Sequence, residues 1–374
     1  MGKKKKYYVL FALVVCLALF GCENEAGKSP DVSNEKVEDK ISIPKESDDK
    51  FAYRQLDDEG KQIYDELYYT IKNHEEEIEV SSLDEEKVDT AFDYVLKDHP
   101  EIFWCDSYKC VRYMAAGKTV SLEVEPIYSM TIEEAGELEK QIELEAQGYI
   151  DGINGNMDGY EKAKFIYTKM IEDIIYNTAS ENNQNIISAF INKETVCQGF
   201  AKAFQYLMYK LDIECTLVRG KANGDSHVWN LIKLDDEYYY VDVTWGSTNF
   251  EDDEYNEKYV NYNYFCITTE EICKNHEITE TMEVPECVSI TNNYFVREGR
   301  YFTEFDIDKI GTVITQAIQN NEVEIALKAS TEEVFKEITN YLIDERHIFD
   351  YYSTNSSISF SKSKFYNVLI IFFE

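Results

Sequence analysis

A cysteine near the middle of the chain stands where it could act as a nucleophile. Cys197 comes directly before a segment with apolar residues at helical spacing, and so lies in the first turn of a predicted helix. The apolar face of that helix is formed by Phe200, Ala203, Phe204, Leu207 and Leu211. A helix N-terminus favours the thiolate, which is the nucleophilic form of cysteine. Alone this is weak evidence, because free cysteines are commonly buried and inert.

A histidine and an aspartate strengthen the case for chemistry. Only His227, of five histidines, lies inside an alternating strand pattern, and Asp242 lies in a second one, where an unpaired acid would be costly. If residues 233–236 form a four-residue connection, His227 faces Asp242 across a hairpin. Asp242 would then hold the imidazole and turn its other nitrogen toward Cys197, as in a Cys-His-Asp triad. A slip of one residue would separate the two side chains.

The segments around these residues resemble a known family. TVCQGFAKAFQYLMYKLDIECTLVRG and DSHVWNLIKLDDEYYYVDVTW are similar to the signature blocks of the transglutaminase-like superfamily, over roughly residues 155–270. The resemblance implies an α+β fold with a papain-like core, in which the nucleophile helix packs on an antiparallel sheet. It also implies that Cys197 is the nucleophile, His227 the general base and acid, and Asp242 the orienting carboxylate.

The same resemblance implies residues that support the reaction. The family's oxyanion hole combines the backbone N–H of the nucleophile with a side-chain donor. Two candidates for that donor are Tyr176, which matches a tyrosine block of the family, and Gln198, which is adjacent to Cys197. Trp229 matches the family tryptophan, and the alternative role for it is a wall of the core.

The first fifty residues predict a membrane anchor. Residues 3–6 are lysines, residues 7–20 are an apolar run too short to span a bilayer comfortably, and Leu-Phe-Gly-Cys at 19–22 resembles a bacterial lipobox. We expect residues 1–21 to be a lipoprotein signal peptide and Cys22 to be lipidated; an ordinary cleaved signal and an uncleaved anchor are the alternatives. Residues 22–50 are polar and predict a flexible tether.

Three folded segments are expected after the tether: an N-terminal α+β module at 51–150, the transglutaminase-like domain at 151–285 and a C-terminal α+β module at 286–374. In the first, helical patterns around 56–67 and 88–95 precede strands at 101–113 and 119–128 and a helix at 131–150. In the second, strands are expected at 215–220, 226–234 and 237–245. In the third we expect a hairpin at 293–302, helices at 306–321 and 331–346, and strands at 322–330 and 365–374.

Charge and cysteine content limit the partners. The net charge of −35 argues against nucleic acid, because phosphate binding needs a basic face. The odd number of cysteines after Cys22 suggests a free thiol, and Cys105 and Cys110 could close a small hairpin, although the pairing is not readable from sequence. No cysteine and histidine spacing predicts a metal site. The acidic segment 249–259 could bind calcium, but its spacing does not match an EF-hand, and a solvated loop is favoured.

These features together predict a cell-surface enzyme. We expect a protein anchored by lipid to the outer side of a bacterial membrane, without a cofactor, that transfers the acyl group of peptide or protein amides, including those of the cell envelope. Water as the acceptor would make it a cysteine peptidase or amidase, and an amine would make it a protein-glutamine acyltransferase. The alternative is a catalytically inactive domain that serves as a cell-surface binding protein. The sequence leaves the oligomeric state open.

Overall fold

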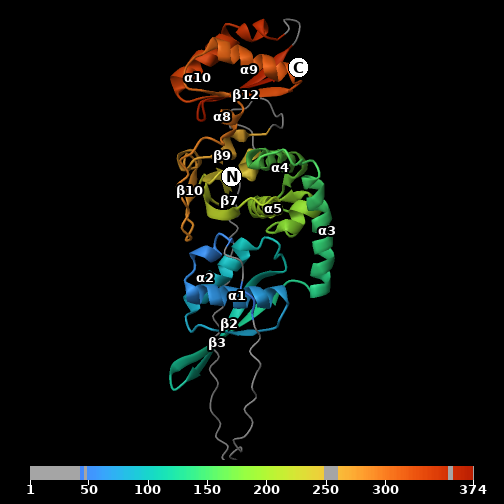
Figure 1. Ribbon diagram of the computed structural model, residues 1–374, viewed down its shortest axis with the longest axis vertical. Helices are drawn as coiled ribbons and strands as arrows, with labels where there is room; N and C mark the ends of the chain where they lie inside the picture. Colours follow the sequence, from blue (N-terminus) through green and yellow to red (C-terminus); the bar gives the residue numbers. More distant parts are fainter. Residues whose placement is uncertain (1–42, 46–48, 248–259, 353–356, 374) are drawn as a thin grey trace, which may run out of the picture. The chain divides into compact units, whose positions relative to one another are not determined.

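Side-chain caps define where most of the helices begin. The computed structural model describes residues 43–45, 49–247, 260–352 and 357–373 (Figure 1). Asp57 accepts a hydrogen bond from the backbone N–H of Gly60 at the start of α1 (Asp58–Lys72), and Thr131 and Glu134 form a capping box at the start of α3 (Ile132–Ile150). Such caps satisfy N–H groups that have no partner inside the helix, so each helix begins at a defined residue.

The N-terminal part contains a three-stranded antiparallel sheet in the order β1-β3-β2, with helices packed beside it. Its remaining elements are η1 (Tyr53–Gln55), β1 (Ile78–Val80), α2 (Glu85–Asp98), β2 (Cys105–Ala115) and β3 (Lys118–Tyr128). The predicted helices and strands of this part are confirmed, with ends that differ by a few residues. The helix α3, predicted at 131–150, closes this part of the chain.

The central part is built on a five-stranded antiparallel sheet in the order β10-β6-β7-β8-β9. The helix α5 (Cys197–Lys210) packs against β6 (Cys215–Ala222) and β7 (Asp225–Leu234), so the fold is α+β with a helix on an antiparallel sheet, as predicted. The other elements are α4 (Gly159–Asp173), β4 (Ile175–Tyr176), η2 (Ser188–Asn192), β5 (Glu194–Thr195), β8 (Glu237–Val241), α6 (Val243–Gly246), η3 (Tyr262–Tyr264), β9 (Phe265–Ile267), α7 (Thr269–Ile272) and β10 (His276–Ile278).

The hairpin between β7 and β8 differs from its predicted register. Its turn has two residues, Asp235 and Asp236, and not four; both have positive φ, at 50° and 67°. This is the conformation of a type I′ turn, whose twist matches that of the flanking strands. Leu234 therefore pairs with Glu237, and every pair lies two residues from its predicted position. Because side chains alternate with a period of two, each side chain keeps its predicted face.

The C-terminal part has a four-stranded sheet in the order β11-β12-β14-β13, with α9 and α10 on one face (Figure 1). The elements are α8 (Tyr294–Arg297), β11 (Tyr301–Phe302), α9 (Ile307–Gln319), β12 (Glu324–Ala329), α10 (Glu332–Thr339), η4 (Asn340–Asp344), η5 (His347–Asp350), β13 (Ile358–Ser363) and β14 (Val368–Phe373). The predicted hairpin at 293–302 is wrong. Asn293 caps a helical turn, and Gly299, at φ 70°, follows it.

The buried side chains form two main cores, and β14 takes part in both. Val368, Ile370 and Phe372 lie in a large core that also holds the apolar residues of the N-terminal and central parts. Leu369 and Ile371 lie in a second core under α9 and α10. Residues 43–374 form one compact unit, and the boundaries predicted at 150 and 285 stay a prediction.

The predicted signal segment, Cys22 and most of the tether lie outside the described residues. Within the described ranges, no helix is both long and apolar enough to cross a bilayer.

Candidate active site

Cys197 is the first residue of α5, and its side chain is partly buried. The parallel pair of β4 and β5 places Tyr176 opposite Thr195, two residues before the cysteine. The N–H groups of the first helical turn have no partner within the helix, so they face any negative charge that develops at this end. The local chain therefore places a thiol, a tyrosine and free N–H donors at one helix end.

His227 lies in β7, opposite Gly220 of β6, and only 7% of it is exposed. Its Nε2 atom lies 2.7 Å from Oδ2 of Asp242 and donates a hydrogen bond to that carboxylate. The side chain of Cys197 is a neighbour of this ring that helps to raise its pKa. Because Nε2 is occupied by Asp242, the nitrogen that faces the thiol is Nδ1. The ring of Trp229 stacks on His227, with the centroids 5.9 Å apart.

Asp242 reaches His227 by a route other than the predicted one. The strand β8 ends at Val241, and Asp242 is the N-cap of α6, where its Oδ1 atom accepts the backbone N–H of Trp245 at 3.0 Å. The predicted direct pairing of His227 with Asp242 is wrong. Continuing the observed register would place Trp229 opposite Asp242, and His227 lies two residues further on the same face. The contact is thus a diagonal one, still within reach of long side chains.

The charges of this pair stabilise each other. Burial lowers the pKa of His227, but the Asp242 charge, its hydrogen bond and the contact with Cys197 outweigh burial and raise this pKa to about 10. Burial also raises the pKa of Asp242, yet the charge and hydrogen bond of His227, together with His276, hold that pKa well below its usual range. The arrangement therefore favours an imidazolium between a carboxylate and a thiol.

The three supporting candidates lie around this pair in different ways. Tyr176 is 49% exposed, and burial together with the charge of Cys197 raises its pKa, so its hydroxyl keeps its proton. Gln198 follows Cys197 in α5 and is half-buried. Trp229 is almost fully buried, and its Nε1 atom has no hydrogen-bond partner among the described residues. Trp229 therefore packs against the histidine, and Tyr176 and Gln198 both stay candidates for the donor.

A second histidine, which the sequence did not single out, completes the cluster. The side chain of His276, in β10, is buried, and its Nε2 atom lies 3.0 Å from the same Oδ2 atom of Asp242. The predictive signal is weak, because β10 has only three residues and pairs with the edge of β6 some distance from the signature blocks.

Two groups of side chains could in principle attract a cation. His227, Asp242 and His276 offer three ligand atoms within 4.8 Å of one another, but these atoms already satisfy each other by hydrogen bonds. Glu77, Glu123 and Glu125 form an acidic group at the surface of the first sheet, of a kind that is common without an ion. The acidic segment 249–259 lies outside the described residues.

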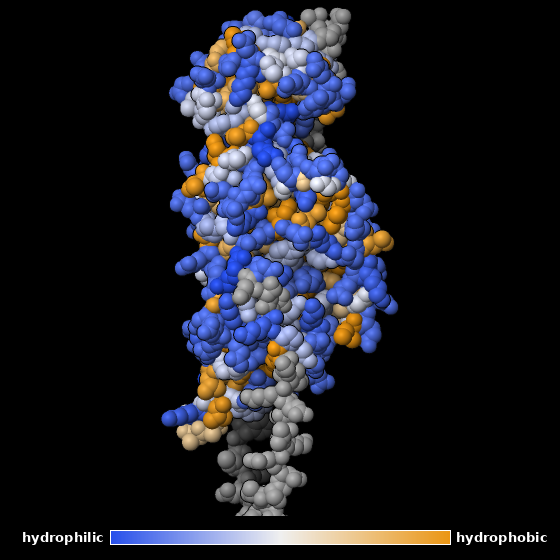
Figure 2. Space-filling model, in the orientation of Figure 1, coloured by the Kyte–Doolittle hydropathy of each residue, from blue (hydrophilic) through white to orange (hydrophobic). Residues whose placement is uncertain are grey.

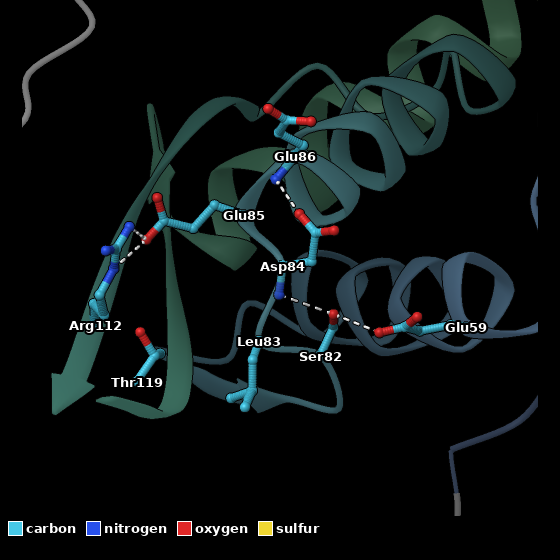
Figure 3. A pocket seen from close by; sticks show the side chains of 8 residues that line it. All are labelled: Glu59, Ser82, Leu83, Asp84, Glu85, Glu86, Arg112 and Thr119. Atoms are coloured by element: carbon cyan, nitrogen blue, oxygen red, sulfur yellow. Dashed lines mark hydrogen bonds and ion pairs between the residues drawn. The ribbon is translucent and has the colours of Figure 1, made fainter. Parts of the chain in front are cut away.

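A hollow of about 530 Å³ in the N-terminal part lies away from these residues (Figure 3). It is lined by Glu59, Ser82, Leu83, Asp84, Glu85, Glu86, Arg112 and Thr119. Three of its four carboxylates are already engaged: Glu85 accepts from Arg112, Glu59 from Ser82 at 2.7 Å, and Asp84 from the backbone N–H of Glu86 at 3.0 Å. None of the residues described above for Cys197 and His227 lines it.

The other cysteines of the described part are all free thiols. They are Cys105, Cys110, Cys215, Cys266, Cys273 and Cys287. Cys105 and Cys110 lie five residues apart in one strand and do not close a hairpin. Burial raises the pKa of each of these six thiols. They are therefore poor competitors for reagents that attack thiolates at neutral pH.

Comparison with known families agrees with this fold. Residues 147–243 match the family model of the transglutaminase-like superfamily, and this part of the chain is a transglutaminase-like domain. The match runs from the end of α3 to the first residue of α6, and so includes Cys197, His227 and Asp242. No curated protein sequence matches it.

Several solved structures are similar in part. A structure named a TGase shares 11% identity over 41% of this chain and 47% of its own, with a TM-score of 0.29. A proposed cysteine protease from Cytophaga hutchinsonii shares 14% over 37% and 62%, with a TM-score of 0.25. A proposed protease from Parabacteroides distasonis shares 11% over 37% and 36%, with a TM-score of 0.22. In each case less than two thirds of the other chain is covered.

Proposed function

We propose that this protein is a cysteine acyl-transfer enzyme that acts on peptide or protein amides through Cys197, His227 and Asp242. The observation that carries the proposal is the buried His227–Asp242 pair beside Cys197: Nε2 of His227 lies 2.7 Å from Oδ2 of Asp242, and the neighbouring thiol helps to raise the pKa of His227. A buried carboxylate that holds an imidazole in one tautomer, next to a thiol at a helix N-terminus, is the arrangement that activates a cysteine nucleophile.

The first half of the reaction forms a thioester. The Cys197 thiolate attacks the carbonyl carbon of the amide, and the negative charge moves to the carbonyl oxygen. The backbone N–H of Cys197 and the hydroxyl of Tyr176 donate hydrogen bonds to that oxygen. As the C–N bond breaks, Nδ1 of His227 gives its proton to the leaving amine. Asp242 keeps Nε2 protonated and the ring in place throughout.

The second half releases the acyl group. Neutral His227 takes a proton from the acceptor, the acceptor oxygen or nitrogen attacks the thioester carbon, and the sulfur leaves as thiolate. With water the product is a carboxylic acid, and with an amine it is a new amide. We propose hydrolysis as the main reaction and transamidation as the second outcome of the test below.

A surface beside Cys197 could accept an extended substrate. Ile175 is 59% exposed and precedes Tyr176 in β4. Figure 2 shows that hydrophobic side chains reach the surface at the level of α4 and α5, whereas most of this face is hydrophilic. Exposed apolar side chains in this part of the chain suit the side chains of a peptide better than a highly charged ligand.

The test begins with the thiol itself. Iodoacetamide labelling of Cys197 is measured against pH in the wild type and in His227→Ala, with Cys197→Ala giving the background from the other thiols. We expect fast labelling of the wild type that persists below pH 7 and is lost in His227→Ala. Labelling with an ordinary thiol profile in both proteins would reject the enzyme and favour the inactive, ligand-binding domain.

The acceptor is identified by products. A panel of glutamine-containing peptides is incubated with the wild type and with Cys197→Ala, with and without a fluorescent alkylamine. Shortened or deamidated peptides that need Cys197 indicate hydrolysis, and a fluorescent adduct that needs Cys197 indicates transamidation. Neither product, from a protein whose thiol is activated, would restrict the proposal to substrates outside the panel.

Surface anchoring through Cys22 is also a proposal, supported by the signal-like segment and the polar residues after it. A peptide or protein of the cell envelope would then be the nearest substrate. In a bacterial host, the wild type should fractionate with membranes, and Cys22→Ala should not be labelled by a palmitate analogue. Labelling of both variants alike would reject lipidation at this residue.

A further inference from the structure

The strand β10 brings a second imidazole to the carboxylate of the active site. The side chain of His276 is buried among the rings of Trp229, Trp245 and Tyr264, at centroid distances of 5.0, 5.3 and 5.9 Å. Its Nε2 atom lies 3.0 Å from Oδ2 of Asp242. We call these three surrounding rings the aromatic box. A buried polar ring whose nitrogen points at a buried carboxylate forms a specific hydrogen bond as well as packing contacts.

Two N–H donors thus share one carboxylate oxygen. Oδ2 of Asp242 accepts from Nε2 of His227 at 2.7 Å and from Nε2 of His276 at 3.0 Å, while Oδ1 accepts only the backbone N–H of Trp245. Each donor draws negative charge from the oxygen, so each weakens the bond that the oxygen makes to the other. The two rings lie 5.4 Å apart, and any positive charge on one also disfavours a proton on the other.

We propose that His276 is a positioning residue of the active site that competes with His227 for Asp242 and so limits how strongly the imidazolium is held. The inference rests on the proposed function. A general acid must release its proton during the reaction, and an imidazolium held by an unshared buried carboxylate would release it reluctantly. Sharing the carboxylate keeps His227 oriented while it eases proton transfer to the leaving amine.

The far side of His276 is also fixed. Its Nδ1 atom lies 2.6 Å from Oδ1 of Asn275, and Nδ2 of Asn275 lies 2.7 Å from the hydroxyl of Tyr264 and 2.9 Å from that of Tyr366. With Oδ1 of Asn275 facing the ring, Nδ1 of His276 donates to it, and Nε2 donates to Asp242. If the side-chain amide of Asn275 is turned over, its NH2 group faces the ring instead, and His276 donates only from Nε2. Both arrangements keep the Nε2–H bond to Asp242, so the competition does not depend on the amide.

The titratable groups around the shared carboxylate come from several elements. Tyr167 of α4 and Tyr264 of η3 both interact with the charge of Asp242, and their own pKa values are raised, so they stay neutral at ordinary pH. Tyr366, in the turn before β14, contacts Tyr264. Cys197 acts on His227 directly, and Tyr176 interacts with the charge of Cys197. His276 is therefore the group through which the Asp242–His227 bond can be altered without changing Cys197 or His227.

The test uses two substitutions at one position in the full chain. His276→Phe keeps a ring in the aromatic box but removes the donor, and His276→Gln keeps an N–H donor that can reach Asp242. Cys197 labelling by iodoacetamide is followed against pH in both variants and the wild type. His347→Gln, which changes an exposed histidine of η5, is the control.

The acid limb of the profile is the pH range in which Cys197 labelling slows as the pH falls. In His276→Phe we expect this limb to move to lower pH by about 0.5–1 unit, because Asp242 then holds the imidazolium of His227 alone. His276→Gln and His347→Gln should stay near the wild type. An unchanged limb, or a shift to higher pH as expected from a loosened site, overturns the role of His276. A wild-type profile typical of an ordinary thiol, unaffected by His227→Ala, overturns the proposed function and the role of His276 together.

A second measurement does not depend on the fold of the phenylalanine variant. Proton NMR of the wild type should show two strongly downfield N–H resonances, from the Nε2–H groups of His227 and His276. In His276→Gln the resonance of His276 should vanish, and that of His227 should stay near its wild-type position, because the glutamine N–H takes the place of the second donor. A wild type with only one such resonance would show that His276 does not donate to Asp242, and would overturn the proposal.

Discussion

The charge on His227 links the stability of the protein to pH. The pKa of this residue, about 10 in the folded protein, lies above its ordinary value of 6.5. A group with a raised pKa stabilises the fold while it is protonated. Its contribution is therefore fully present below about pH 6.5 and is lost as the pH rises toward about 10. Asp242 behaves oppositely: its lowered pKa adds stability above pH 3.8, which is lost only as the pH falls below that value.

Replacing the histidine tests this linkage. The wild type should melt above His227→Gln at pH 6, by roughly 5 °C or more, and the difference should shrink steadily between pH 6.5 and 10. Circular dichroism melts at unit pH intervals measure it. His347→Gln, at an exposed ring, should follow the wild type at every pH. If the difference in melting temperature between the wild type and His227→Gln stays constant from pH 6 to 10, then His227 is not held in its charged form by Asp242.

Individual site residues differed in how well the sequence could predict them. Cys197, His227 and Asp242 each stand at a recognisable place: a helix start and two alternating strands. His276 lies in a three-residue strand, where no periodicity can develop, and its role depends on a β10–β6 pairing that local sequence does not encode. The long-range contacts of such short strands cannot be predicted from periodicity.

At the scale of elements, the position of α5 depends on one glycine. A Cβ atom on Gly199 would lie 1.8 Å from Oγ1 of Thr195 and 3.0 Å from the carbonyl oxygen of Asn183. The close neighbours of Gly199 thus belong to β5 and to the loop before η2. Any larger residue must push the start of α5, and Cys197 with it, away from these segments.

Gly199→Ala should therefore lose both stability and reactivity. We expect a fall of about 1–3 kcal/mol in the free energy of unfolding, from the overpacking, and at least a tenfold slower labelling of Cys197 at pH 7. Urea unfolding and iodoacetamide kinetics measure the two effects. Gly136→Ala, in α3, is the matched control: no atom lies within 4 Å of its new Cβ, and the exchange should add about 0.5–1 kcal/mol. If Gly199→Ala and Gly136→Ala show the same stability and the same labelling rate, the position of α5 does not depend on Gly199.

Two local departures from prediction have physical causes in the turns. The pair Asp235-Asp236 forms the β7–β8 turn although it lacks the glycine that usually marks such a turn, because aspartate tolerates positive φ better than most residues. The predicted register was consequently off by two residues. The segment 293–302 has two apolar runs around a polar stretch with a glycine, like a hairpin, yet the cap at Asn293 favours a helical turn. In both places a polar turn residue overrides the pattern around it.

At the scale of the whole molecule, β14 connects the C-terminal part to the active-site core. Its apolar run VLIIFF has one face in each of the two main cores. A strand buried on both sides has a continuous apolar sequence. The sequence therefore predicted the strand, but it did not show which two cores the strand joins. The turn before β14 carries Tyr366, whose hydroxyl reaches Tyr264 and Asn275 behind His276. The C-terminal part thus touches the residues that hold the shared carboxylate.

Removing one hydroxyl tests whether this contact matters to the site. Tyr366→Phe should lower the free energy of unfolding by about 1 kcal/mol, and it should move the acid limb of Cys197 labelling to lower pH by less than about 0.5 unit. The direction matches His276→Phe because a looser Asn275 holds His276 less firmly against Asp242. Tyr351→Phe removes a comparable bond, to the hydroxyl of Tyr341 at 3.1 Å, within the C-terminal part alone. It should cost similar stability and leave the labelling profile unchanged. If both tyrosine variants shift the profile equally, the effect is one of general stability, and the C-terminal part has no specific influence on the catalytic histidine.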